Sequence, residues 1–423
     1  MKTKQLYFFA AAAMLFAACT KDDPKKEEVS EKAPQAITFD TYVPNATRAG
    51  AAGVMTTTTL QTTGFGVFAQ QGAAYSATAD PNANFMYNQA VTIENSAWTY
   101  TPLKYWPNET ATDSNGATST DTEGLSFFAY APYVADATTG TSGITGMSAN
   151  NATTDPTITY TVATKPSESV DLLWGVAPTG GLSYTNVANT TTTVTAGLPL
   201  INLLKPAKEQ KIKFLFKHAL ARLGMTVVAA VDQIPAGGTL GAGTKIYVNS
   251  VKITDAATTA TIPSSATLNL NNTSKGEGIA YWTDPVTTTP FTCTINSANE
   301  LNANLQGSAE TQEKAGVTTS ETPVLADGKY LMLIPTPGTA ATLKVEIDYT
   351  VITNDDKLSA SYAETNNKIT KTVTLTSGAS VGFTNNKAYN LKLILGLTSV
   401  KLDAEVAEWE IAGSTEVDLP KNK

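Results

Sequence analysis

The chain has few of the side chains on which catalysis and metal binding most often depend. Among its 423 residues are two cysteines and a single histidine, His218. One histidine excludes a histidine-rich metal site, and its apolar neighbours favour a packed, hydrogen-bonded core residue. The sequence contains no nucleophile elbow, phosphate-binding loop, dinucleotide fingerprint or zinc-type cysteine spacing. We therefore expect a protein that is not an enzyme and that carries no cofactor or metal.

Charge is also scarce, and arginine most of all. Charged residues make up 16 % of the chain and the net charge is −8. Lysines are spread along the sequence, so nothing would neutralise a row of phosphates, and we expect no nucleic-acid partner. Arg48 and Arg222 are the two arginines. Arg222 lies in an apolar segment that we expect to be folded.

What the sequence does contain is typical of β-sheet. Apolar residues account for 42 % of the chain, which is enough for packed cores. Threonine-rich, alternating runs are separated by Gly, Asn and Pro clusters, and this pattern predicts an all-β fold. Polar stretches at 109–123, 135–156, 263–278 and 296–320 are interpreted as loops or insertions, whereas 212–223 is interpreted as strand. Cys293, which has no partner cysteine in the body, is interpreted as a small buried apolar residue.

The first 18 residues have the pattern of a signal peptide. Lys2 and Lys4 precede an apolar stretch from Leu6 to Ala18. That stretch is too short to span a bilayer as a helix, and no later apolar run is long enough.

A lipid anchor is expected at the end of this signal. Residues 15–19, Leu-Phe-Ala-Ala-Cys, resemble the lipobox of bacterial lipoproteins, which implies acylation (palmitate) of Cys19. An ordinary secretory signal with an incidental cysteine is the alternative. Residues 19–48 would then form a lipidated tether and a leader strand, with the lipid as the only contact with the outer membrane.

A short strand and an arginine follow the tether. Ile37, Phe39 and Val43 alternate onto one face, which predicts a half-buried strand. The glycine- and alanine-rich segment after it contains Arg48. An arginine-specific protease would find one accessible site there, although a solvated loop arginine is the alternative. A cut between Arg48 and Ala49 would release the strand and leave an open sheet edge.

Motifs along the body resemble those of the fimbrillin family of Bacteroidales-type bacteria, which are the lipoprotein-derived, protease-matured pilins of type V pili. Together with the lipobox and the leader, they cover nearly the whole chain. The motifs are GFGVFA (64–69), FMYN (85–88), WTY (98–100), YWP (105–107), LSFFAYAP (125–132), DLLW (171–174), FKHALARL (216–223), LMLIP (331–335), NKAYNL (386–391) and VAEW (406–409).

The resemblance implies two β-sandwich domains of transthyretin-like topology, which we place at 49–207 and 208–423. It also implies cleavage at Arg48–Ala49, assembly with other fimbrial subunits by donor-strand exchange, cell adhesion, and a final location in a cell-surface fimbrium. The donor strand would come from residues 401–420. Its apolar candidates are Leu402, Ala404, Val406, Trp409, Ile411, Val417 and Leu419.

Three other functions compete with a fimbrial shaft or tip subunit. A lipid-anchored protein that binds glycans through exposed tryptophans would not polymerise, although core packing is the favoured interpretation of the tryptophans. A fimbrial anchor subunit would keep its lipid. A glycosidase is the most distant alternative, because nothing in the sequence brings two carboxylates together.

Overall fold

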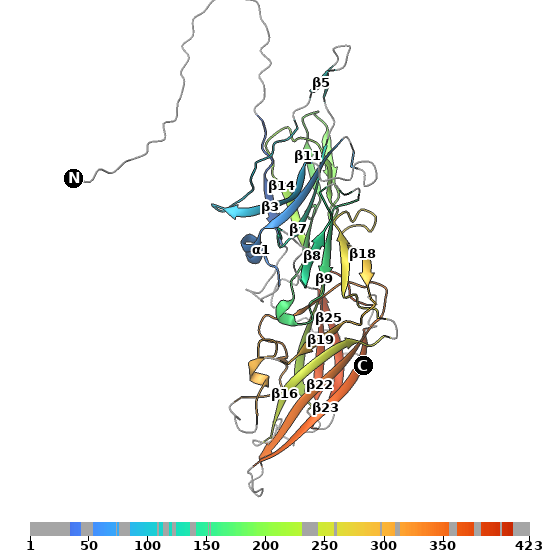
Figure 1. The fold of residues 1–423 in the computed structure, drawn as a ribbon. Coiled ribbons are helices and arrows are strands. Elements are labelled where there is room, and N and C mark those ends of the chain that lie inside the picture. The colour runs from blue at the N-terminus through green and yellow to red at the C-terminus, as the bar shows by residue number, and fades with distance from the viewer. Residues whose placement is uncertain are drawn as a thin grey trace, which may run out of the picture. The chain divides into compact units, whose positions relative to one another are not determined.

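The structure is a computed structural model. It describes residues 34–408, apart from residues 44–53, 73, 76–84, 108–109, 113–117, 121–123, 136–140, 151, 153, 231–243, 258–259, 297, 309–313, 355–361, 376–381 and 398–399. Nearly all the regular structure in the described residues is β-strand (Figure 1), so the predicted all-β class is confirmed. The transthyretin-like topology stays a prediction.

The largest sheet contains the N-terminal strand. In spatial order its strands are β1 (Phe39–Tyr42), β14 (Ile212–His218), β10 (Leu173–Val176), β7 (Gly124–Ala131), β2 (Phe65–Gly72), β3 (Met86–Glu94) and β4 (Ala97–Thr99), with β13 (Leu200–Leu203) beside β7. Strand β1 therefore lies at one end of the sheet, and among the described strands it pairs with β14 alone.

Between residues 57 and 286 lie several smaller elements that do not belong to this sheet. A four-stranded sheet has the order β18 (Tyr281–Val286), β17 (Ser265–Asn269), β9 (Thr157–Thr161) and β8 (Gly143–Met147). The others are the pairs β11 (Leu182–Thr185) with β12 (Thr191–Val194) and β5 (Thr110–Thr112) with β6 (Thr118–Thr120), the helix α1 (Thr57–Thr63) and the 3-10 turn η1 (Pro166–Glu168).

Two further sheets form a sandwich from the C-terminal half. One has the order β20 (Thr322–Pro323), β15 (Ala221–Ala229), β24 (Lys387–Leu395) and β25 (Val400–Glu408), with β21 (Leu331–Leu333) also beside β15. The other has the order β19 (Thr292–Ile295), β16 (Thr244–Asp255), β22 (Ala341–Asn354) and β23 (Tyr362–Leu375). A 3-10 turn, η3 (Ala303–Leu305), follows β19 in the chain. In Figure 1, β16, β22 and β23 run side by side as long strands.

The core is divided into two main clusters. Alternating side chains of β15 and β24 meet those of β16 and β22 in one buried cluster, as expected when two sheets pack face to face. The second cluster lies in the large sheet and is rich in phenylalanine, including Phe39 of β1. Cys293 is fully buried in the first cluster.

The strands agree with most of the expected pattern, with one correction. Residues 212–223 form β14 and the start of β15, as predicted. The stretches 135–156 and 263–278 were expected to be loops or insertions, yet they contain β8 and β17, which pair with the two sides of β9. The stretch 109–123, interpreted in the same way, contains the paired strands β5 and β6.

The domain limits at 207 and 208 stay a prediction. Sheet pairing nonetheless crosses that limit twice, because β14 belongs to the large sheet and β17 pairs with β9.

Candidate functional site

The segment from Gln35 to Val43 fills a slot between two other parts of the chain. On one side β1 runs parallel to β14, with Phe39 opposite Ile212, and the Ile212 amide donates to the Thr38 carbonyl at 2.8 Å. On the other side the Ile37 amide donates to the Lys104 carbonyl and the Trp106 amide to the Gln35 carbonyl, each at 2.9 Å. The segment thus completes the backbone hydrogen bonding of two elements that are far apart in sequence.

The inward side chains of this leader strand are buried. Ile37, Phe39 and Val43, the residues predicted from the alternation, are at most 4 % exposed. At about 1.5–3 kcal/mol for each side chain, their burial contributes roughly 5–9 kcal/mol before the entropy of ordering is subtracted.

Phe39 lies at the centre of an aromatic cluster. Its ring centroid is 5.5 Å from that of Tyr100 and 6.0 Å from those of Phe65, Phe127 and Phe214. The ring stacks on Phe214 of β14 and meets Phe65 and Phe127 edge-on. Favourable ring geometry adds to area burial, so Phe39 is the main side-chain anchor of the leader strand.

Tyr100 closes the slot with a polar contact. Its hydroxyl donates to the Ile37 carbonyl at 2.9 Å and accepts from the Lys104 amide at 3.2 Å. Burial raises the pKa of Tyr100 to about 12, and the backbone hydrogen bond at Lys104 partly offsets this. The hydroxyl of Tyr100 thus links the leader strand to the backbone at Lys104.

The leader strand fits its slot imperfectly. Thr41 follows Ile37 and Phe39 on the inward face, and its hydroxyl is buried with no hydrogen-bond partner among the described residues. The hydroxyl of Thr38 is in the same situation. A buried, unsatisfied hydroxyl costs about 1–3 kcal/mol, so a strand with apolar side chains at these positions would bind the slot more tightly.

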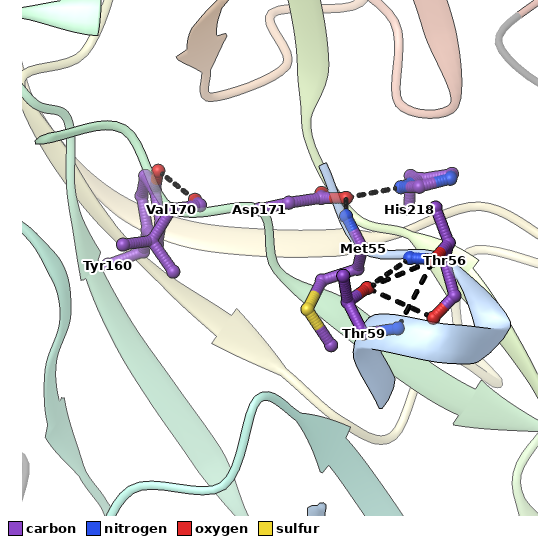
Figure 2. Close-up of polar contacts among 7 residues, drawn as sticks. All are labelled: Met55, Thr56, Thr59, Tyr160, Val170, Asp171 and His218. Atoms are coloured by element: carbon purple, nitrogen blue, oxygen red, sulfur yellow. Dashed lines mark hydrogen bonds and ion pairs between the residues drawn. The ribbon is translucent and has the colours of Figure 1, made fainter. Parts of the chain in front are cut away.

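The chain is anchored on both sides of the segment 44–53. Before it, the Val43 carbonyl accepts from the Thr57 hydroxyl at 3.3 Å. After it, the Met55 amide donates to Asp171 Oδ2 at 2.9 Å, and His218 Nδ1 lies 2.7 Å from the same oxygen (Figure 2). All three residues of this second anchor are buried, and His218 is a hydrogen-bonded core residue as predicted.

Helix α1 begins directly after this anchor. Thr56 caps it, because its hydroxyl accepts from the Thr59 amide while the Thr59 hydroxyl accepts from the Thr56 amide (Figure 2). This capping box satisfies amides that the first turn leaves free. The first described residues after 44–53 thus have a contact with the body, from Met55 to Asp171, that does not involve the leader strand.

The C-terminal strand β25 forms an edge of its sheet. It pairs antiparallel with β24 from Val400–Leu395 to Glu408–Lys387. Leu402, Ala404 and Val406 are half-buried and contact the first core cluster, whereas Leu391 and Leu393 of β24 are fully buried. Of the other donor candidates, Trp409, Ile411, Val417 and Leu419 lie outside the described residues.

The remaining predicted sites can be placed only in part. Cys19, Arg48 and Ala49 lie outside the described residues. Arg222 is half-buried in β15, and its guanidinium lies over the Tyr330 ring at 4.5 Å. No helix in the described part of the chain is long and apolar enough to cross a membrane.

Two of the described tryptophans are buried in the core and two are partly exposed. Trp106 and Trp174 are buried, as predicted, whereas Trp98 and Trp282 are only half-buried. The second wall of the slot, at 104–106, and the role of Tyr100 were not predicted. The one available signal was the aromatic-rich string around Tyr105 and Trp106.

Comparisons with known proteins agree with the resemblance inferred from the motifs. A scan against protein-family models finds no match. Fimbrium subunit Fim1C of Phocaeicola vulgatus is 29 % identical over 266 residues, which span 61 % of this chain and 58 % of that protein. A crystal structure of a fimbrial protein from Bacteroides vulgatus superposes with a TM-score of 0.61 and 22 % identity, covering 89 % of this chain and 99 % of the other. The predicted resemblance to fimbrial subunits is confirmed, and the shared fold is that of a fimbrial protein.

Proposed function

We propose that this protein is a structural subunit of a cell-surface fimbria that supports adhesion. It is exported as a lipoprotein acylated at Cys19, cut between Arg48 and Ala49, and polymerised when a C-terminal segment of another copy replaces the leader strand. The observation that carries the proposal is the slot, in which a separate N-terminal strand completes the phenylalanine-rich core. The similarity to fimbrial proteins supports the same function.

The slot suits strand replacement for two physical reasons. The leader contributes one backbone ladder to β14 and three buried side chains, all of which another strand can supply in trans. Its unsatisfied Thr38 and Thr41 hydroxyls lower its own affinity, so a more apolar strand is favoured at equilibrium.

Arg48 suits the role of the cleavage site. It lies between two anchors, at Val43 and at Met55, so a cut there separates the leader from the body without detaching α1. Arg222 is half-buried and stacked on Tyr330, which makes it a poor substrate for a protease while the protein is folded.

The proposal is tested with lipid-free protein that begins at Thr20 and includes the leader. Treatment with an arginine-specific protease is expected to give one cut, at Arg48–Ala49, followed by a ladder of oligomers on size-exclusion chromatography. Arg48→Lys keeps the charge and is the matched control, which should remain an intact monomer.

Deletion of residues 409–423 distinguishes cleavage from assembly. The truncated protein should be cut normally and stay monomeric. A clean cut of the full chain that leaves a stable monomer would contradict polymerisation and favour a lipid-anchored glycan-binding protein or a fimbrial anchor subunit instead.

A further inference from the structure

A hollow of about 420 Å³ opens beside the edge strand β18, well away in sequence from the leader slot. Its walls come from residues 260–287 and from the turn at 334–339. A volume of this size lies in the range of small-molecule sites in proteins.

The walls of this hollow are held rigidly. Four prolines line it, Pro263, Pro285, Pro335 and Pro337, and each fixes its own backbone φ angle. The turn at 334–339 is further tied down by Thr336, whose amide donates to the Phe383 carbonyl at 2.8 Å. A preformed wall lowers the entropy cost of binding a ligand.

The aromatic side of the hollow is Trp282. Its indole N–H donates to the Ala219 carbonyl at 3.1 Å, and its ring meets Tyr160 edge-on. The polar edge of the indole is therefore occupied inside the protein. The half-buried remainder offers the hollow a carbon surface, which attracts the weakly positive C–H groups of a pyranose ring.

Among the residues that line the hollow, the one charged side chain is Lys275. Lys275 is exposed at its rim, and its ammonium is held 4.7 Å from the Tyr281 ring centroid. The described residues include no ion-pair partner for Lys275. No aspartate or glutamate is among the residues that line the hollow. Threonine side chains such as Thr287 and Thr339 add hydroxyl groups.

We propose that this hollow is a binding site for a saccharide that carries a carboxylate, such as a terminal sialic or uronic acid. The sugar ring stacks on Trp282, its hydroxyls meet the threonine side chains, and its carboxylate pairs with Lys275. The site does not depend on strand exchange, so an uncut monomer is sufficient to test it.

The test is a titration of the lipid-free monomer, followed by tryptophan fluorescence. The probes are oligosaccharides that end in sialic acid or glucuronic acid, each with the neutral oligosaccharide that lacks the acidic residue. An acidic probe is expected to bind at millimolar or lower concentration and more tightly than its neutral counterpart. Trp282→Phe should abolish the fluorescence change, whereas Trp98→Phe, at a half-buried tryptophan in the other core cluster, should keep it.

Lysine variants test the charge. Lys275→Gln should weaken binding of the acidic probe about fivefold, the size expected for one partly exposed charged contact, and leave neutral probes unchanged. Lys344→Gln, an equal charge change on an exposed residue of β22, is the matched control and should have no effect.

Three results would overturn the proposal. The first is that no acidic saccharide binds at millimolar concentration, and the second is that binding is unaffected by Lys275→Gln. The third is that no saccharide binds, whereas polymerisation protects the fluorescence of Trp282 from quenching by acrylamide. That result would show that a neighbouring subunit occupies the hollow.

Discussion

Replacement of Phe39 by alanine tests whether the leader strand is held mainly by its buried face. Phe39 is 1 % exposed and its ring meets four others, so truncation leaves a cavity that the surrounding rings cannot fill. Truncation of a buried phenylalanine typically costs about 3–5 kcal/mol. If the loss falls on leader docking, the ratio of docked to released leader drops by a factor of roughly 10² to 4 × 10³.

The assay is hydrogen exchange of the uncut, lipid-free protein, read at the amides of β1 and β14. Phe39→Ala should speed exchange at β14 residues such as Ile212, because the released leader exposes them. The matched control is Tyr42→Ala, at a residue of the same strand that is 39 % exposed and stacks on none of these rings. Equal effects of the two variants would refute the assignment of Phe39 as the anchor, as would unchanged exchange in Phe39→Ala.

Three further predictions follow from the slot and its neighbouring anchor. Thr41→Val removes a buried, unsatisfied hydroxyl and should stabilise the docked leader by about 1 kcal/mol. Hydrogen exchange at the β14 amides should then slow down. Faster exchange would show that the hydroxyl has a partner. Burial raises the pKa of Tyr100 to about 12, so the stability linked to this raised pKa is complete below pH 10 and is lost as the pH rises towards 12. Ultraviolet titration should therefore show this tyrosine ionising near 10 once the leader is released, and no change would contradict the account. His218→Ala leaves the Asp171 carboxylate buried beside Met55 without its imidazole partner. The free energy of unfolding, measured by urea titration, should fall by about 3–5 kcal/mol. A loss below about 1 kcal/mol would show that solvent replaces the histidine.

Local pattern was enough to predict the leader strand but not its surroundings. The alternation of Ile37, Phe39 and Val43 is contained in seven residues, and a period of two is a direct signature of a strand with one buried face. The second wall of the slot depends on pairing between Ala36 and Tyr105, and such long-range pairing leaves no local signal.

The misassigned loops failed for a related reason. Strand β17 is short, and three of its five residues are polar because only one face is buried. It is a strand because it pairs with β9, where Ala266 lies opposite Tyr160, more than a hundred residues away in sequence. Tertiary pairing overrides local composition in such segments.

The local environment of the single histidine was predicted correctly. The single histidine was interpreted as a core residue, and His218 is buried against Asp171. The hollow beside Trp282 could not be predicted, since it combines a strand edge with the distant turn at Pro335 and Pro337.

The central claim is that the strand beside β14 is exchanged between subunits. The most direct measurement is cryo-electron microscopy of filaments formed after cleavage at Arg48. The account predicts that each slot, between β14 and residues 104–106, holds a C-terminal strand from a neighbouring copy. A slot that is empty, or that still holds Ile37, Phe39 and Val43 of its own chain, would contradict it.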